Sequence, residues 1–403
     1  MSSDRRAVIT GVDLLCPSGE TPEALHGGLC RTGPARSPIN RINGTSALAP
    51  TAPDAYLAGR NAYPLDRPAR LLSAAAQLAL DDGGWTAEHS KSREIGLYVG
   101  TMFSSAHTIS RFDCMSVQEG PAYVSPFDFA NTVINAPSGQ TAIWHGLRGV
   151  NMTVATGGSS GLEAIGSAAL AIRTGCVDAV LAGGVEELSP ESLRAFDEVG
   201  LLSRSGEDPR PFDEKSTGLS LSESAALVLL EELDSARLRG TRVMAEVRGH
   251  GSAFDTSRRR DERHFVRSII RSMRLAIEEA GFGLDDIDVV CASANGMARV
   301  DRHEAVAIAS VFESRTDVPP VSAVKSLLGE PLGAAGPPQC AAMIVAMRTG
   351  IIPVPLDLRR LPGNVVSLAQ RAHSSRALIR TCLINSLSYD GHACSLVITS
   401  SAA

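Results

Sequence analysis

A glycine-rich turn in the first half of the chain has the pattern of a site for a nucleophile. Residues 155–161 read ATGGSSG, after the strand-like run NMTV and before the small-residue run LEAIGSAALAI. A strand that turns through glycines into a helix presents unpaired backbone N–H groups, which stabilise negative charge. The question for the rest of the chain is which group this turn holds.

The segments around the turn alternate between strand and helix patterns. The run 68–84 begins with proline and ends with glycines, as helices commonly do. Apolar strand-like runs lie at 6–12, 95–100, 150–156, 177–184 and 224–233. This alternation predicts an α/β protein.

A similar order begins again near residue 243 and suggests a duplicated unit. We therefore divide the chain into an N-terminal half, 1–240, and a C-terminal half, 241–403. Each half holds a run of almost only small apolar residues, at 160–172 and 333–347. Helices that are apolar on all sides are buried, so two central helices between two sheets predict five layers, α-β-α-β-α.

Composition excludes several classes of partner. The net charge of −6 and the pI near 5.9 give no reason to expect binding to nucleic acid or to an anionic membrane. No apolar run approaches the roughly 20 residues that span a bilayer, and the N-terminus lacks a signal-peptide pattern, so we expect a cytoplasmic protein. The 8 cysteines have no metal-like spacing, and we expect no metal site.

Several segments, spread over nearly the whole chain, together form a family pattern. In order they are VITGVDLLCPSG, GLRGVNMTVATGGSSG, AGGVEELSP, RPFDEKSTGLSLSESAALVLLEEL, VKSLLGEPLGAAG and NSLSYDGHACSLVI. In this order the chain resembles the β-ketoacyl-acyl carrier protein synthases of the thiolase superfamily. The resemblance implies the thiolase fold.

Active members of that family use one Cys and two His. The Cys thiolate takes the acyl chain from the phosphopantetheine arm of an acyl carrier protein, and the His side chains stabilise the enolate formed from the malonyl unit. The resemblance places the Cys position at Gly158, the first His position at Asn295 and the second at Glu330. The family's lysine is retained as Lys325, and no bound cofactor is implied.

These substitutions predict a subunit with no catalytic residues of its own. Glycine offers no nucleophile, and an ionised Glu330 would put negative charge where the enolate must form. Gln339 stands where a Glu usually pairs with the lysine, so we expect an ion pair between Lys325 and Glu330 instead.

Two loops also depart from the family pattern. The family's gating loop is Gly-Phe-Gly-Gly, whereas this chain has Ser388, Tyr389, Asp390 and Gly391. The polar Asp390 removes a glycine where backbone freedom is normally needed. The segment after Asn295 is two residues shorter than in the family, which indicates a remodelled loop on the substrate side.

A ketosynthase-like chain without the cysteine resembles the chain length factor of type II polyketide synthases. That resemblance implies a heterodimer with a catalytic ketosynthase, substrates carried on an acyl carrier protein, and a tunnel wall supplied by this chain. The corresponding segment is TMFSSAHTISRF, in which Ala106, Ile109 and Phe112 have helical spacing. A stripe packed against its own core explains that spacing equally well. The commonest factors have Gln at the Cys position, so both aromatic and reduced polyene products stay open.

Two other functions remain as alternatives. Residues 157–161 also fit the G-x-S-x-G elbow of serine hydrolases, with Ser159 as nucleophile and Asp213 with His250 or His392 as its partners. The chain could also be an unusual acyltransferase that uses Asn295 and forms no covalent intermediate. Activity of the purified chain alone would favour one of these.

Overall fold

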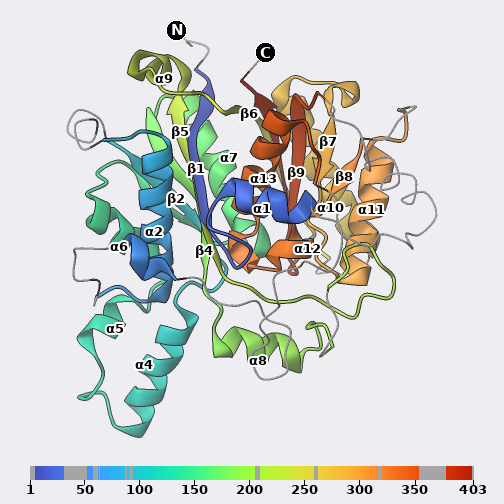
Figure 1. The fold of residues 1–403 in the computed structure, drawn as a ribbon. Coiled ribbons are helices and arrows are strands. Elements are labelled where there is room, and N and C mark those ends of the chain that lie inside the picture. The colour runs from blue at the N-terminus through green and yellow to red at the C-terminus, as the bar shows by residue number, and fades with distance from the viewer. Residues whose placement is uncertain are drawn as a thin grey trace.

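Each half of the chain forms five neighbouring strands, and the two halves arrange their strands in the same spatial order. The computed structural model describes residues 5–30, 52–57, 62, 64–86, 89, 94–204, 209–257, 262–315, 319–353 and 378–401. Within these residues the N-terminal half has the order β3-β2-β4-β5-β1, and the C-terminal half has β8-β7-β9-β10-β6 (Figure 1). The strands are β1 (Ala7–Leu15), β2 (Gly96–Gly100), β3 (Asn151–Val154), β4 (Ala179–Glu186), β5 (Ser224–Glu232), β6 (Ala245–Phe254), β7 (Val289–Cys291), β8 (Val321–Ser322), β9 (Thr381–Leu387) and β10 (His392–Ser400).

Strand directions repeat as well. In each half the first two strands in this order, β3-β2 and β8-β7, are parallel, and so are β2-β4 and β7-β9. The remaining neighbours are antiparallel in both halves. The halves join where β1 pairs with β6 over Val8↔Glu246 and Ile9↔Ala245, so the hydrogen-bonded ladder is continuous. The exact division between residues 240 and 241 stays a prediction.

Two buried helices form the central layer. They are α7 (Ser160–Arg173) and α13 (Gly336–Thr349), whose small side chains let their backbones approach closely. A Cβ on Gly161 would lie 2.7 Å from the Pro337 side chain, and one on Gly336 would lie 2.6 Å from Leu162 Cβ. Only glycine permits these contacts, which explains the small-residue runs in the sequence.

Further helices cover the outer faces of the two five-stranded halves. The N-terminal sheet is covered by α2 (Arg67–Asp82), which starts at the N-cap Asp66, and by α6 (Ala136–His145). The C-terminal sheet is covered by α10 (Glu262–Ala280) and α11 (Ala298–Val311). The five layers expected from the sequence are thereby confirmed, with one apolar core, shared by α7 and α13, running through both halves.

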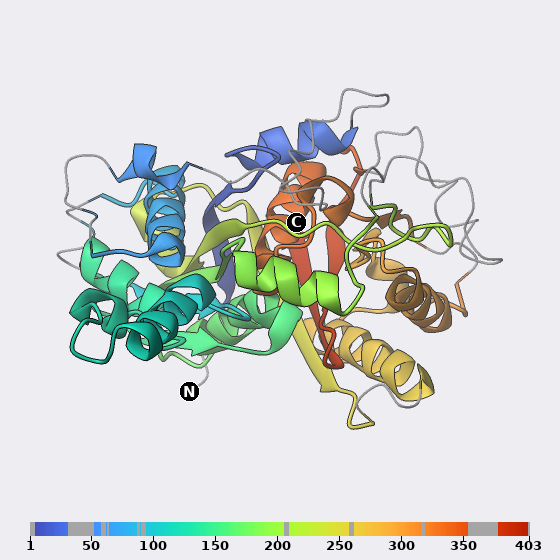
Figure 2. The ribbon, with the colours of Figure 1, turned by 90° about the horizontal axis from the view of Figure 1, so that it is seen from below.

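Two helices project from the N-terminal half. In Figure 1, α4 (Ala106–Gln118) and α5 (Pro126–Ala130) extend below the sheets, and seen from below both lie on one side of α8 (Pro190–Glu198) (Figure 2). The other described helices are α1 (Pro22–Cys30), α9 (Leu233–Arg239), α12 (Lys325–Leu328) and the short 3-10 turns η1 (Pro53–Tyr56), η2 (Gly157–Ser159), η3 (Leu284–Asp286) and η4 (Leu332–Ala334). Of the described helices, none has the length and apolar character needed to cross a membrane.

Candidate active site

The elbow predicted from the glycine-rich turn joins β3 to α7. Gly157 has a φ of +67°, a conformation that favours glycine, and begins the turn η2. Ser160 fixes the turn because its Oγ donates to Gly157 O at 2.6 Å and accepts from Thr156 N at 2.8 Å. The elbow is therefore a rigid strand-to-helix turn of the kind that presents a nucleophile.

Gly158 occupies the position where the nucleophile would stand, and its backbone groups are already bonded. Its N–H donates to Ser388 Oγ at 2.9 Å, and its carbonyl accepts from Ser386 Oγ at 3.1 Å. A Cβ added to Gly158 would lie 3.0 Å from Leu387 O. The turn between β9 and β10 thus closes onto the elbow and takes the N–H that could otherwise stabilise an oxyanion.

Glu330 is the centre of a buried polar cluster beside the elbow. Its Oε2 lies 2.9 Å from Lys325 Nζ, so the expected ion pair is present, with the two side chains 3% and 1% exposed. Lys325 Nζ also donates to Ser293 Oγ at 3.2 Å, and Leu332 N donates to Glu330 Oε1 at 3.0 Å. Both carboxylate oxygens therefore have donors, which is what a buried charge requires.

Asn295 completes this cluster, and both N–H groups of its side-chain amide donate hydrogen bonds within it. Its Nδ2 donates to Glu330 Oε2 at 2.5 Å and to the Tyr389 hydroxyl at 3.2 Å. Burial and the nearby Glu330 carboxylate raise the pKa of Tyr389 well above its usual value. With both N–H bonds committed, Asn295 has no donor left to polarise a thioester, which weighs against the acyltransferase alternative.

A second layer of carboxyl groups lies behind Asn295. Asp301 accepts from Asn295 N at 3.1 Å, and Glu304 accepts from Ser293 N at 2.8 Å and from Asn385 Nδ2 at 3.1 Å. Burial raises the pKa of Asp301 to about 6 and that of Glu304 to about 7, while the charge of Lys325 opposes both shifts. The positive charge of Lys325 thus interacts with three carboxyl groups, those of Glu330, Asp301 and Glu304.

The gating-loop residues form a tight hairpin turn. Gly391 has a φ of +104° and keeps the glycine conformation, whereas Asp390 accepts from the backbone of His392 at 3.2 Å. Tyr389 packs edge-on against Phe196, with ring centroids 5.5 Å apart. This turn therefore contacts both the elbow and the Glu330 cluster.

The sequence did not indicate two residues that organise the site. Ser293 is not part of any motif, yet it connects Lys325 to the backbone of Leu387. Its Oγ accepts hydrogen bonds from Lys325 Nζ and, at 3.0 Å, from Leu387 N. Its position two residues before Asn295 was the available signal, since alternate positions of an extended segment share a side. Glu186, at the end of β4, accepts from Phe103 N at 2.8 Å and fixes the loop that leads into α4.

Gln339 and the three predicted tunnel-wall residues lie in different parts of the structure. Gln339 is buried on α13, and the other three lie on α4. Gln339 Nε2 donates to the Ala292 and Asn385 carbonyls at 2.8 and 3.1 Å, so it connects β7 with β9. Ala106, Ile109 and Phe112 all lie on α4 and are partly exposed. Thr108 is the one buried residue of α4, and both explanations of these positions, a tunnel wall and a stripe packed against this chain's own core, stay predictions.

The hydrolase triad is assembled only in part. Ser159 Oγ lies 2.9 Å from His392 Nδ1 but is fully buried and donates to a carbonyl of the elbow at 2.8 Å. Asp213 pairs with Arg210 at 3.3 Å, and His250 pairs with a glutamate of α7. The structure therefore brings Ser159 and His392 together without the predicted carboxylate.

Comparison with known proteins defines the class to which this fold and this site belong. Residues 4–236 match the N-terminal domain of the β-ketoacyl synthases, and residues 244–359 match the C-terminal domain. The chain belongs to the β-ketoacyl synthase family.

Individual relatives include a 3-oxoacyl-[acyl-carrier-protein] synthase and a polyketide synthase subunit. The chain is 32% identical to 3-oxoacyl-[acyl-carrier-protein] synthase 2 of Rhizobium meliloti over 334 residues, 81% of this chain and 79% of the relative. It is 30% identical to the tetracenomycin polyketide synthase ketoacyl synthase alpha subunit of Streptomyces glaucescens over 374 residues, 87% of each chain. It is thus similar to ketosynthases of type II polyketide systems.

Solved structures agree on the fold. A chain of the ishigamide ketosynthase/chain length factor superposes with a TM-score of 0.87 at 26% identity, over 99% of this chain and 100% of that chain. A β-ketoacyl synthase from Burkholderia phymatum gives 0.85 at 25% identity, over 98% and 99%. The thiolase-like ketosynthase fold expected from the sequence is confirmed.

Proposed function

We propose that this chain is a non-catalytic ketosynthase-like subunit that pairs with an active ketosynthase and limits the length of the chain the partner makes. In this role it is the chain length factor of a type II polyketide synthase. The partner supplies the cysteine and histidines, and this chain supplies part of the tunnel wall. The growing chain stays attached to the partner and to the phosphopantetheine of an acyl carrier protein.

The observation that carries the proposal is Gly158. The elbow keeps its geometry, yet it has no thiol, and its N–H is bonded to Ser388 Oγ at 2.9 Å. Where a second histidine would stand, Glu330 is held by Lys325 and Asn295 in a closed set of hydrogen bonds. An acyl-enzyme needs a nucleophile and an oxyanion site, and this arrangement offers neither.

An exposed apolar surface on one side of the N-terminal half supports the presence of a partner. Strand β3 is the last strand of the described sheet, and Met152 on it is 42% exposed. The nearby segments carry further exposed apolar side chains, namely Phe127, Phe129, Val133, Ile134, Ile143, Val150 and Leu170. Apolar patches of this kind commonly mark protein interfaces, and an open strand edge allows a sheet to continue into a second subunit.

The projecting helices support a role in the tunnel. Ile109 and Phe112 on α4 are only partly covered within this chain, and Phe112 contacts Phe129 of α5 with ring centroids 5.8 Å apart. A helix with so little of its own core needs another surface to cover its apolar side. In the proposed heterodimer that surface is the acyl channel of the partner.

Co-expression with a candidate catalytic ketosynthase tests the pairing. The expected result is a stable one-to-one complex, and no condensation by this chain alone. Met152→Arg should weaken the complex, because a charge at the open strand edge is buried on association. Leu238→Arg is the matched control, since Leu238 lies on α9 and is 83% exposed.

Two outcomes would contradict the pairing. A stable homodimer that binds no ketosynthase removes the proposed partner. Condensing activity of the purified chain, with a malonyl-carrier substrate and no second subunit, removes the proposed lack of catalysis.

A further inference from the structure

A group of metal-ligating side chains lies on the far face of the elbow helix, outside the Glu330 cluster. In the β6–β10 ladder Cys394 pairs with Ser252, and Leu396 pairs with His250. Alternate residues of a strand share a face, so His250 and Cys394 point to the same side of the sheet. That side packs against α7, which presents Glu163.

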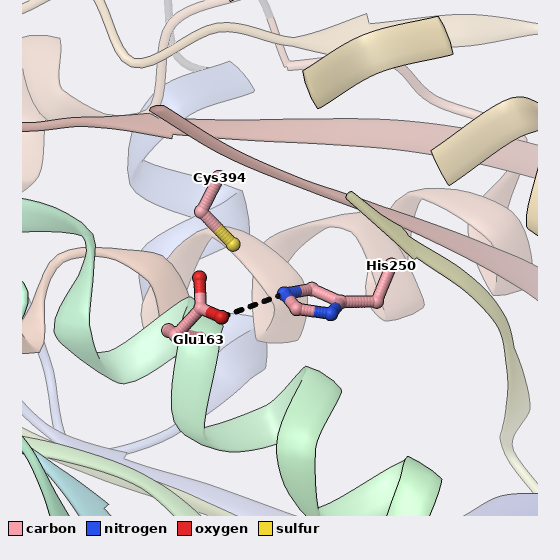
Figure 3. Close-up of side chains that lie close together, drawn as sticks. All are labelled: Glu163, His250 and Cys394. Atoms are coloured by element: carbon pink, nitrogen blue, oxygen red, sulfur yellow. Dashed lines mark ion pairs between the residues drawn. The ribbon is translucent and has the colours of Figure 1, made fainter. Parts of the chain in front are cut away.

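The three side chains converge on one point. A ring nitrogen of His250, a carboxylate oxygen of Glu163 and the sulfur of Cys394 all lie within 4.8 Å of one another. Figure 3 shows the thiol and the carboxylate directed toward the same edge of the imidazole ring. They come from three separate elements, β6, α7 and β10, which is why no spacing in the sequence indicated them.

The separation of His250 and Glu163 suits a shared ion better than a direct hydrogen bond. His250 Nε2 lies 3.3 Å from Glu163 Oε1, beyond the usual range for N–H···O. Around a tetrahedral Zn²⁺ with bonds of about 2.0–2.2 Å, neighbouring ligand atoms lie about 3.3–3.5 Å apart. The observed distance therefore equals one edge of such a tetrahedron.

Two polar atoms of the group lack hydrogen-bond partners. Within the described residues these atoms are Glu163 Oε2 and His250 Nε2, and the latter has only its 3.3 Å ion pair with Glu163 Oε1. The two side chains are 15% and 18% exposed, so an ion and a water molecule can reach them, while Cys394 is fully buried. Unsatisfied buried polar atoms around an accessible point are what a cation would satisfy.

The helix backbone fixes the position of the imidazole. A Cβ on Gly166 would lie 2.3 Å from His250 Cδ2, so the ring rests directly on α7. The backbone N–H of His250 donates to Glu279 Oε2 at 2.5 Å, which fixes the strand at this position. These two contacts hold the imidazole in one orientation, in which it faces Glu163.

We propose that Glu163, His250 and Cys394 bind one Zn²⁺ ion, with water as the fourth ligand. The thiol releases its proton to solvent when the Zn–S bond forms, so the ion replaces that proton on sulfur. Thiolate and imidazole favour Zn²⁺ over Mg²⁺ and Ca²⁺, which prefer oxygen ligands. The ion connects α7 to β6 and β10 and so holds the elbow helix against the C-terminal sheet. This site is independent of the proposed pairing with a ketosynthase.

Metal titration of the full-length chain, purified with its partner where the chain requires one and stripped with a chelator, tests the site. We expect about one tightly held Zn²⁺ and, with Co²⁺ in its place, a thiolate-to-cobalt charge-transfer band. Cys394→Ser should abolish the band and weaken Zn²⁺ binding at least about 100-fold. Cys382→Ser should change neither, because Cys382 is an equally buried thiol on the neighbouring strand β9.

A second pair of variants separates this site from surface binding. Glu163→Gln keeps the side-chain volume and should also weaken Zn²⁺ binding, and it decides the matter if Cys394→Ser does not fold. His107→Gln is its control, because His107 and Glu191 form an exposed pair at 3.2 Å without a thiol. Absence of the cobalt–thiolate band, or Zn²⁺ binding that Cys394→Ser and Glu163→Gln leave unchanged, would overturn the proposal.

Discussion

The pair of Lys325 and Glu330 is buried so completely that neutralising one partner should destabilise the protein measurably. In Glu330→Gln the Lys325 ammonium, with its side chain 1% exposed, keeps Ser293 Oγ at 3.2 Å as a direct acceptor. Breaking a buried pair from one side costs about 3–5 kcal/mol. Asp301 and Glu304 still interact with Lys325 in this variant and offset part of the cost. We therefore expect the lower end of that range, about 3 kcal/mol.

Thermal unfolding of the complex measures this effect. For a chain of 403 residues a loss of about 3 kcal/mol corresponds to a decrease in Tm of about 3–4 °C. The double variant Lys325→Met with Glu330→Gln removes both charges and should recover at least half of the loss. Glu198→Gln should leave Tm unchanged, because its pair with Arg194 is exposed on α8. A Tm of Glu330→Gln equal to that of the unsubstituted protein would refute the reasoning.

The remaining predictions concern pH and the empty nucleophile position. Burial raises the pKa of Glu304 to about 7, so its contribution to stability is full below about pH 4 and is lost as the pH rises through 7. Glu304→Gln should therefore flatten the fall in Tm between pH 5.5 and 8, and an unchanged slope would contradict this origin. Gly158→Cys should give no acyl-enzyme by intact mass after incubation with an acyl-carrier substrate, because the N–H of residue 158 that would stabilise the oxyanion is bonded to Ser388 Oγ. Condensation by Gly158→Cys alone would show that only the thiol was missing.

Much of the fold followed from apolar patterns in the sequence. The run 68–84, which has the ends of a helix, forms α2, Arg67–Asp82, and the strand predicted at 224–233 forms β5, Ser224–Glu232. Both are long and strongly patterned, so local and tertiary preferences agree. The strand β8 comprises only Val321–Ser322, and each of these residues pairs with one residue of β7.

The site was predictable where it rested on residue identity and not where it rested on turn geometry. The ion pair of Lys325 and Glu330 followed from the family resemblance, which places both residues in one pocket and puts Gln339 where the lysine's usual acidic partner stands. The bond from Gly158 N to Ser388 Oγ did not follow, since it depends on how the β9–β10 turn bends toward an elbow 230 positions away. The position of Tyr389 over Asn295 depends on the same turn.

The length of the polyketide made by the reconstituted heterodimer is the most direct test of the central claim. With the partner ketosynthase and a malonyl-loaded carrier protein, Phe112→Ala should lengthen the product by at least one two-carbon unit, because it opens the proposed tunnel wall. Val117→Ala, on the same helix and 86% exposed, should leave the length unchanged. Acylation of the partner's cysteine, followed by intact mass, should be equal in all three complexes. If Phe112→Ala and Ile109→Ala both leave the product length unchanged while the complex stays active, this chain does not shape its partner's reaction through α4.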